Sequence, residues 1–517
     1  MGNLKSISDK RKLLINIAAS MSAFVLNVAV GFFISPYIVR TLGVEANGYI
    51  QLANNIISYV SIITVAINSM SGRFITIAIA TDETDKAVGY YTSVFWANVV
   101  LAVLLLLPFI GVIWRLDSLI NITAGLVSDV KMLLALAFVN FVLSNLLSLW
   151  NNAYYATNTL FLQYARIAIA TIVRVVITII LFVSLKPRVF YVTLAALLCV
   201  PLTAFWSFRD KERLLPVLKI NNEKFSLIKL KEIVSSGIWR SLQATGEILL
   251  TGLDLLICNL FISPIAMGVL ALSKTVPSMI QQLNWQIAST FAPKLTINFA
   301  QERKEEIWNE LKHSFKILAV IGTIPLGGLI IFGQDFFRLW VPGEDAGMLQ
   351  VLSVLSCFWM ALLAGVQPVG NVFATVNKVK PQAISVIISG ILNTVLVLFA
   401  VRFTNLGIYA VAGTSVLIGL LRNLCYTIPA SARYLGFAWH KFYIGVWYSA
   451  ICTAIVMCIG YIARQLIYPA GWKLMFISCS VTAVLAFAVN TLVILSKEER
   501  ILIFALAKKL IGRLAKR

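Results

Sequence analysis

NNAYYATNTLFLQ at residues 151–163 and GNVFATVNKVKPQ at residues 370–382 are two versions of one pattern. Both contain an Asn, an aromatic residue, a second Asn and a Gln in the same order, and equivalent positions lie 219 residues apart. The pairs are Asn152 and Asn371, Tyr154 and Phe373, Asn158 and Asn377, and Gln163 and Gln382. Identical spacing in two distant parts of a chain indicates an internal duplication.

A second match lies at nearly the same offset. NGYIQLANNIISYV at residues 47–60 aligns with MGVLALSKTVPSMI at residues 267–280 when the shift is 220 residues. This shift pairs Gly48 with Gly268, Asn54 with Lys274, and Asn27 with Glu247. Because both matches fall in equivalent apolar segments, we expect two homologous halves.

Long apolar segments fill most of the chain. Hydrophobic residues make up 59% of the 517 residues and charged residues 13%, which is more apolar surface than a soluble protein of this size can bury. A helix needs about 20 apolar residues to cross a membrane. Windows of about this length lie near 13–38, 46–70, 88–114, 130–152, 160–184, 189–207, 233–260, 264–288, 314–337, 347–370, 382–402, 404–430, 441–463 and 471–495.

Together these features predict an all-α polytopic membrane protein of about fourteen transmembrane helices, with two six-helix lobes related by the repeat and two further C-terminal helices. The expected boundaries are 1–208 for the N-terminal lobe, 209–232 for a basic cytoplasmic linker, 233–432 for the C-terminal lobe, 433–496 for spans 13 and 14, and 497–517 for a basic amphipathic tail. Two lobes with even numbers of spans enter the membrane from the same side. Such lobes enclose a central cavity, and rocking them gives alternating access.

The net charge of +21 reflects membrane topology rather than nucleic-acid binding, because Lys and Arg gather in short connections and at both ends. With both termini in the cytoplasm, the cytoplasmic segments contain far more Lys and Arg than the external ones, as the positive-inside rule requires. The tail has two open interpretations. It is an interfacial helix on the inner leaflet, or a solvated basic segment that only enforces the topology.

Several charged residues lie inside the predicted spans, where a charge costs from about 3 to more than ~10 kcal/mol unless it faces protein or water. Span seven carries Arg240, Glu247 and Asp254 at i, i+7 and i+14, which places them on nearly one face of a continuous helix. Lys274 in span eight has the polar counterpart Asn54 in span two. Both lobes therefore carry polar groups at equivalent places.

The candidate substrate-binding residues are Arg240, Glu247, Asp254, Lys274, Arg166, Arg174, Asn27, Gln51, Asn54 and Arg422. Ion pairs that lock helices together are the alternative interpretation, and Arg422 lies where a long side chain can snorkel to the cytoplasmic interface. The excess of cations favours an anionic substrate such as a diphosphate or acidic sugar. Glu247 and Asp254 fit either hydrogen bonds to sugar hydroxyls or carriage of a coupling proton, and both roles stay open.

Two segments carry a resemblance to a known family: SPYIVRTLGVEANGYIQLANNI at residues 35–56 and SSGIWRSLQATGEILLTGLDLLI at residues 235–257. In the first, Arg40, Leu42, Gly43, Gly48 and Tyr49 follow the family's pattern. With its 6+6+2 arrangement, the chain resembles the multidrug/oligosaccharidyl-lipid/polysaccharide (MOP) exporter superfamily over essentially its whole length. Within that superfamily it looks like a bacterial polysaccharide transporter of the O-antigen and capsule flippase branch.

The resemblance implies export of an undecaprenyl-diphosphate-linked oligosaccharide from the inner to the outer leaflet of the bacterial plasma (inner) membrane. The polar head crosses the cationic cavity while the lipid tail stays in the bilayer, and in relatives spans 13 and 14 are associated with a groove for that tail. The expected partners are this lipid-linked oligosaccharide, the bilayer, a proton or sodium ion for coupling, and other polysaccharide-assembly membrane proteins. No cofactor and no metal site are expected.

Three rival functions remain open. They are a MATE-type cation-coupled drug or metabolite antiporter, a flippase for lipid II, the peptidoglycan precursor, and a membrane glycosyltransferase, polymerase or ligase. An enzyme of the last kind needs a sizeable loop with paired carboxylates or a His, whereas the external loops are short and the two histidines, His313 and His440, lie near predicted cytoplasmic connections. No GxxxxGK[ST] motif is present. We therefore expect a transporter rather than an enzyme.

Overall fold

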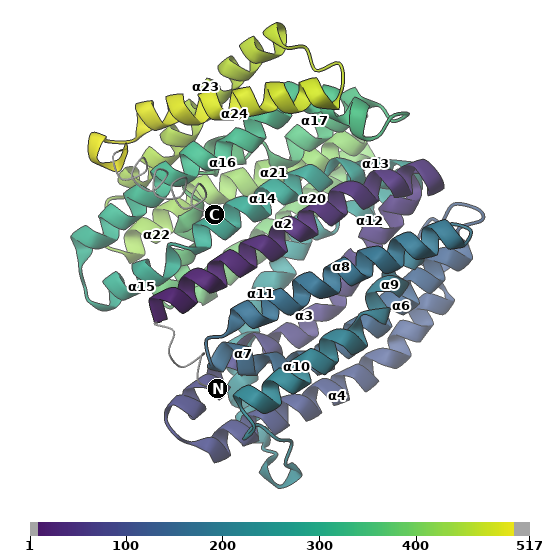
Figure 1. Cartoon of the computed structure of the whole chain (residues 1–517), viewed down its shortest axis with the longest axis vertical. Helices are drawn as coiled ribbons and strands as arrows, with labels where there is room; N and C mark the ends of the chain where they lie inside the picture. The colour runs from purple at the N-terminus through teal and green to yellow at the C-terminus, as the bar shows by residue number, and fades with distance from the viewer. Residues whose placement is uncertain (1–8, 501–517) are drawn as a thin grey trace, which may run out of the picture. The chain divides into compact units, whose positions relative to one another are not determined.

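The computed structural model describes residues 9–500, which form helices joined by short connections and contain no strand (Figure 1). The first half contains α2 (Asp9–Leu42), α3 (Val44–Ala80), α4 (Thr84–Trp114), α5 (Leu116–Leu119), α6 (Val127–Leu147), η1 (Ser148–Asn151), α7 (Asn152–Ala156), α8 (Leu160–Ser184), α9 (Tyr191–Leu198), α10 (Val200–Leu214) and η2 (Asn222–Lys224). The second half contains α11 (Leu227–Glu247), η3 (Ile248–Gly252), α12 (Asp254–Phe261), α13 (Pro264–Ser273), α14 (Thr275–Ser289), α15 (Ala292–Ala300), α16 (Lys304–Trp340), α17 (Ala346–Cys357), α18 (Met360–Leu363), η4 (Gln367–Asn371), α19 (Val372–Thr375), α20 (Val379–Phe403), α21 (Ile408–Arg422), η5 (Asn423–Thr427), α22 (Ile428–Tyr434), η6 (Trp439–Tyr443), α23 (Ile444–Leu466) and α24 (Trp472–Ile494).

The helices confirm a polytopic membrane protein. Within residues 9–500, 11 helices are long and apolar enough to cross a membrane, and the segment from α11 to α12, bent by 43°, makes up to 12. The two remaining windows, 264–288 and 347–370, hold broken helices instead of the single spans expected. Pro277 explains the first break, because it has no N–H for the carbonyl of Ser273, and the hydroxyl of Ser353 donates to that carbonyl instead at 2.7 Å.

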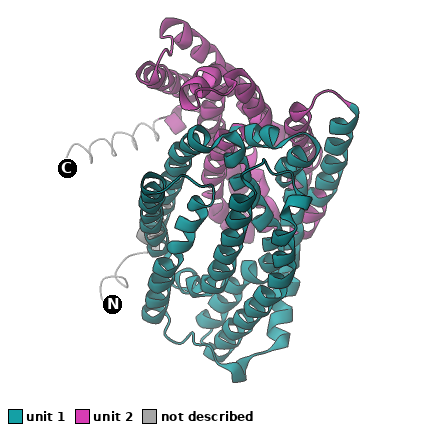
Figure 2. Ribbon diagram, turned by 90° about the vertical axis from the view of Figure 1, so that its right-hand side faces the viewer, with its two compact units in different colours: residues 1–272, 386–403 teal, residues 273–385, 404–517 magenta. Residues whose placement is uncertain are grey.

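The chain divides into two compact units, shown in Figure 2. Unit 1 comprises Met1–Leu272 and Val386–Phe403, and unit 2 comprises Ser273–Ser385 and Thr404–Arg517. The core of unit 1 includes Ile67, Ile75, Ala87, Tyr91, Val94, Leu149, Leu218 and Ile233. The core of unit 2 includes Leu311, Phe315, Leu363, Val366, Val372, Ile428 and Phe442. The boundaries of the two six-helix lobes and of the linker remain predictions.

The element boundaries follow the repeat. Helices α8 and α20 each have 25 residues and begin 219 positions apart, at Leu160 and Val379. The helix α3 runs unbroken from Val44 to Ala80, whereas its counterpart 220 residues later is divided into α13, α14 and α15 over 264–300. The first of these divisions falls at Lys274. One half therefore keeps a continuous helix where the other half has a segmented one.

Left-handed backbone residues follow the repeat as well. The non-glycine residues with positive φ among the described residues are Asn158 (52°) and Asn377 (56°), which are 219 apart, and Asp82 (57°) and Glu302 (55°), which are 220 apart. Each ends a helix in the left-handed conformation that commonly satisfies the last carbonyls. For example, the N–H of Thr159 donates to the carbonyl of Tyr154, and the N–H of Lys378 donates to that of Phe373.

The glycines that the repeat pairs also contact one another. A Cβ added to Gly48 of α3 would lie 2.8 Å from the Cα of Gly268 in α13, and one added to Gly268 would lie 2.4 Å from the carbonyl oxygen of Val44. Both helices belong to unit 1 over these positions. Only glycine permits this approach of the two backbones, which gives a packing reason for one of the sequence matches.

Candidate functional site

The charged face predicted for span seven is interrupted. Arg240 and Glu247 are exposed on α11, and Gln243 donates to the Glu247 carboxylate at 3.0 Å. The π-helical turn η3 then interrupts the α-helix, and Asp254 begins α12 with only 1% of its surface exposed. The spacing of 14 residues assumed a continuous α-helix, so the expectation of one shared face does not extend across the break to Asp254.

Side chains from two neighbouring helices stabilise this break. The carbonyls of Leu249 and Leu250 accept hydrogen bonds from Thr394 Oγ1 (3.0 Å) and Asn393 Nδ2 (2.8 Å) of α20. Inside a membrane a carbonyl released from a helix must find another donor, and π-helical turns are frequent at functional sites. Asn393 was expected only as a polar counterpart of Arg174, and its actual role is to satisfy the backbone.

The carbonyl of Gly252 is satisfied in the same way from α3. It accepts hydrogen bonds from Asn55 Nδ2 (3.1 Å) and Tyr59 Oη (2.6 Å). The helices α3 and α11 also approach closely, because the Ser241 hydroxyl donates to the carbonyl of Ile62 at 2.8 Å and a Cβ on Gly237 would overlap the carbonyl oxygen of Ala66. The bend at η3 is therefore a built feature of unit 1.

The predicted polar residues of spans one and two lie on α2 and α3 of unit 1. Asn27 is exposed and donates to the carbonyl of Ala23 in its own helix at 2.9 Å. Asn54 is exposed and Gln51 is half-buried. These positions leave Asn54 and Gln51 open to a polar environment, as expected for residues that line a pathway.

Two predicted cations lie in unit 2 next to irregular helical turns. Lys274 is half-buried at the break between α13 and α14. Arg422, also half-buried, is the last residue of α21 and immediately precedes the π-helical turn η5. Each therefore stands where a helix changes geometry. Whether either one meets the cations of unit 1 stays a prediction.

Arg166 and Arg174 are both half-buried on α8, but only Arg166 lines a cavity. Arg166 Nε lies 3.3 Å from Asp210 Oδ2, and its guanidinium lies 5.3 Å from the ring centre of Trp206. The same carboxylate oxygen accepts the hydroxyl of Tyr154 at 2.8 Å. The positive charge of Arg166 is thus already offset within unit 1, which weakens its expected role as a diphosphate ligand.

The cavity beside Arg166 has a volume of about 200 Å³. It is lined by Ser144, Leu147, Ser148, Asn151, Tyr154, Gln163, Arg166, Ile167, Val200, Thr203, Ala204 and Ser207. Sequence reasoning singled out Tyr154 and Gln163 only as markers of the repeat and assigned no role to Asp210, which lies in the predicted linker. A usable signal was the change of Tyr154 to Phe373 in the second half, since it removes one hydroxyl from an otherwise preserved pattern.

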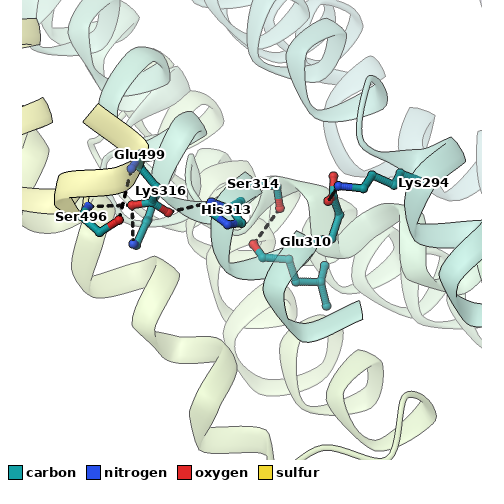
Figure 3. A network of polar contacts seen from close by, with 8 residues as sticks. Lys294, Glu310, His313, Ser314, Lys316, Ser496 and Glu499 are labelled. Atoms are coloured by element: carbon teal, nitrogen blue, oxygen red, sulfur yellow. Dashed lines mark hydrogen bonds and ion pairs between the residues drawn. The ribbon is translucent and has the colours of Figure 1, made fainter. Parts of the chain in front are cut away.

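Ion pairs connect the two C-terminal helices to α16 at both ends. At one end Arg464 Nε of α23 lies 2.8 Å from Asp335 Oδ2, a carboxylate with 1% exposure. At the other end, shown in Figure 3, Glu499 contacts Lys316 Nζ at 2.7 Å and His313 Nδ1 at 2.6 Å. Sequence reasoning placed His313 near a connection but did not detect either set of ion pairs.

The residues around Glu499 also begin a helix after α24. The Ser496 N–H donates to the Glu499 carboxylate at 2.7 Å and the Glu499 N–H donates to the Ser496 hydroxyl at 3.4 Å, which is a capping box. Burial raises the pKa of Glu499, but hydrogen bonds from Lys316 and Ser496 outweigh it and hold that pKa below its ordinary value. The predicted tail helix beyond residue 500 lies outside the described residues.

No protein-family model matches the chain. A membrane protein of Bacillus subtilis (strain 168), named EpsK and described as uncharacterized, is 28% identical over 97% of this chain and 99% of its own length. An inward-facing MATE family transporter of the MOP superfamily aligns with 83% of this chain and 99% of its own, with a TM-score of 0.63 and 14% identity. The lipid II flippase MurJ, in an inward closed conformation, aligns with 93% of this chain and 98% of its own, with a TM-score of 0.64 and 12% identity.

The chain has the fold of the MOP superfamily. This confirms the fold that the sequence resemblance implied. Since these structural neighbours are transporters and a flippase, the likeness also agrees with a protein that is not an enzyme. A fold alone does not identify a substrate, so assignment to the polysaccharide branch remains a prediction.

Proposed function

We propose that this protein is a flippase for a lipid-linked oligosaccharide. It moves an undecaprenyl-diphosphate-linked repeat unit, of the O-antigen or capsule kind, from the inner to the outer leaflet of the bacterial inner membrane by alternating access. The observation that carries the proposal is the extent of the structural likeness. A lipid flippase aligns with 93% of the chain, whereas the inward-facing MATE transporter aligns with 83%, and the longer match favours a lipid-linked substrate.

The C-terminal helices α23 and α24 support this proposal. They are secured to α16 by Asp335 and Arg464 at one end and by Lys316 and Glu499 at the other. One face of α24 exposes large apolar side chains, namely Ile477, Val481, Val484, Leu485 and Leu492. The opposite face buries polar ones, namely Ser478, Thr482 and Asn490. An apolar face held firmly against the transport domain suits a lipid tail that stays in the bilayer.

The diphosphate is assigned to cations that no printed carboxylate contact neutralises. Arg240 is exposed on α11, and Lys274 is half-buried at a helix break. An arginine can bind a phosphate with two parallel hydrogen bonds, and a lysine binds it as a point charge. Arg166 is left out of this set because Asp210 already pairs with it.

The deciding experiment is reconstitution of the full-length protein into vesicles with lipid-linked oligosaccharide from its host. Exposure of the sugar on the opposite leaflet would be followed with a membrane-impermeant lectin, with and without a proton gradient. We expect protein-dependent exposure of the oligosaccharide and none of a cationic drug. Transport of the drug alone would favour the antiporter, and rescue of cells depleted of their lipid II exporter would assign the peptidoglycan precursor instead.

A further inference from the structure

We infer that the cavity beside Arg166 is a binding site for a single sugar ring, made entirely by unit 1. This deepens the proposed function, because it gives the transported oligosaccharide a neutral subsite separate from the residues assigned to its diphosphate. No comparison assigns a role to this cavity. Its position at the junction of α6, α7, α8 and α10 places it at the end of unit 1 that the predicted topology puts in the cytoplasm.

The charge of the cavity favours a neutral ligand. Arg166 faces Asp210 at 3.3 Å, and the carboxylate of Asp210 is 6% exposed, so the pair contributes no net charge. The remaining polar lining consists of hydroxyl and amide groups, including Asn151, Gln163 and Ser207. A phosphate would need cations without an internal partner. A sugar hydroxyl, which both donates and accepts, matches amides and hydroxyls.

The size of the cavity limits the ligand to one ring. Its volume of about 200 Å³ is below the roughly 300–1,000 Å³ of pockets that enclose drug-sized ligands. Two polar groups are already aligned within it, because Ser207 Oγ donates to Asn151 Oδ1 at 3.1 Å. The Asn151 amide nitrogen is then free to turn its two hydrogens toward a bound hydroxyl.

The second half of the chain provides an internal comparison. At an offset of 219, Arg166 becomes Ser385, Tyr154 becomes Phe373, and Asn151 becomes Gly370. Asp210 corresponds to Pro429 or Ala430 at an offset of 219 or 220, and neither has a carboxylate.

The corresponding region of unit 2 is closed by apolar packing, with Leu363, Val366, Val372 and Ile428 in one buried cluster. The same architecture therefore folds with an apolar filling. Since the fold does not require these polar groups, their presence around a cavity in unit 1 needs a functional explanation.

The test uses the full-length protein in nanodiscs and saturation-transfer NMR with free glucose, galactose, N-acetylglucosamine and rhamnose, with glycerol and inorganic phosphate as comparison probes. We expect saturation transfer to at least one monosaccharide and not to phosphate. Gln163→Leu should weaken this binding at least about tenfold, as loss of a hydrogen bond of ~1.4 kcal/mol would. The matched control is Gln382→Leu at the repeat-equivalent position, which should bind sugar like the unaltered protein.

If Gln163→Leu lowers the thermal stability of the protein, Asn151→Leu serves as the second variant. Absence of transfer to all four sugars, equal binding by Gln163→Leu and Gln382→Leu, or phosphate or glycerol binding that Gln163→Leu abolishes would each overturn the inference. The assay requires no transport. Sugar binding without flipping would therefore refute only the proposed function, and flipping without this binding would refute only the subsite.

Discussion

The carboxylates and guanidinium of span seven differ in what can reach them. Arg240 and Glu247 are exposed on α11, whereas Asp254 is buried beyond the π-helical turn. An exposed cation in a polar pathway can bind a passing anion directly. A buried carboxylate is better suited to gain or lose a proton in response to a change of its surroundings. The three residues are therefore assigned separate experiments.

Replacing both Arg240 and Lys274 with Ala should lower export of lipid-linked oligosaccharide at least tenfold. The reason is the loss of two charge-assisted contacts, each worth about 1.5–3 kcal/mol, to the diphosphate. Export would be measured in vesicles by lectin access, with protein insertion checked by quantitative blotting. Lys86→Ala is the control, since Lys86 pairs with Glu83 on an exposed turn. Unchanged export by the double variant would remove both residues from the pathway.

Asp254→Asn should change how export depends on the proton gradient while leaving the protein inserted. The amide keeps the size of this buried side chain but cannot carry a proton. The measurement is export by the variant with and without an uncoupler. Should the variant stay as sensitive to the uncoupler as the unaltered protein, Asp254 is not the coupling group.

At the scale of elements, sequence periodicity located the long helices but not their interruptions. The windows near 88–114 and 160–184 correspond to α4 and α8, because uniform apolar runs have one stable form in a membrane. The turn η3 depends on Asn55, Tyr59, Asn393 and Thr394. These donors are distant in sequence from the carbonyls that they satisfy, so no local pattern announces the break.

Asn393→Leu should destabilise the protein by about 1–3 kcal/mol, the cost of leaving a buried carbonyl without its donor. The affected carbonyl is that of Leu250, so the loss should appear as a lower midpoint of thermal unfolding in detergent. Asn54→Leu is the comparison, since Asn54 is exposed on α3. Equal midpoints for the two variants would show that η3 does not depend on this bond.

The contact of Glu499 with α16 should weaken in acid. Because the pKa of Glu499 is held below its ordinary value of 4.5, its ion pairs stabilise the folded chain above that value, and the stabilisation is lost as the pH falls through the lower folded pKa. Hydrogen exchange at residues 495–500 between pH 7 and pH 3 would follow this loss, with intrinsic rates subtracted.

The background for this experiment is His313→Ala, because His313 also faces Glu499 and gains a proton over the same range. Glu499→Gln is the control and should exchange quickly with little dependence on pH. Exchange at these residues that remains slow down to pH 3 would contradict the contribution assigned to the Glu499 carboxylate.

At the scale of the whole molecule, the duplication was the most informative part of the sequence. It anticipated the matching starts of α8 and α20, and it also accounts for the paired left-handed residues Asn158 and Asn377. It could not anticipate the cavity beside Arg166, because the polar contacts there arose where the two halves diverged. Asp210 has no acidic counterpart, so the repeat gave no reason to examine it.

The contrast between α3 and its segmented counterpart has a practical consequence for observing the transport cycle. A pair of spin labels placed two turns apart on α3 would act as a ruler of fixed length, because nothing interrupts that helix from Val44 to Ala80. A pair placed on either side of Lys274 would act as a strain gauge. Pulsed distance measurements on the two pairs, taken with and without substrate, should give one constant and one changing separation.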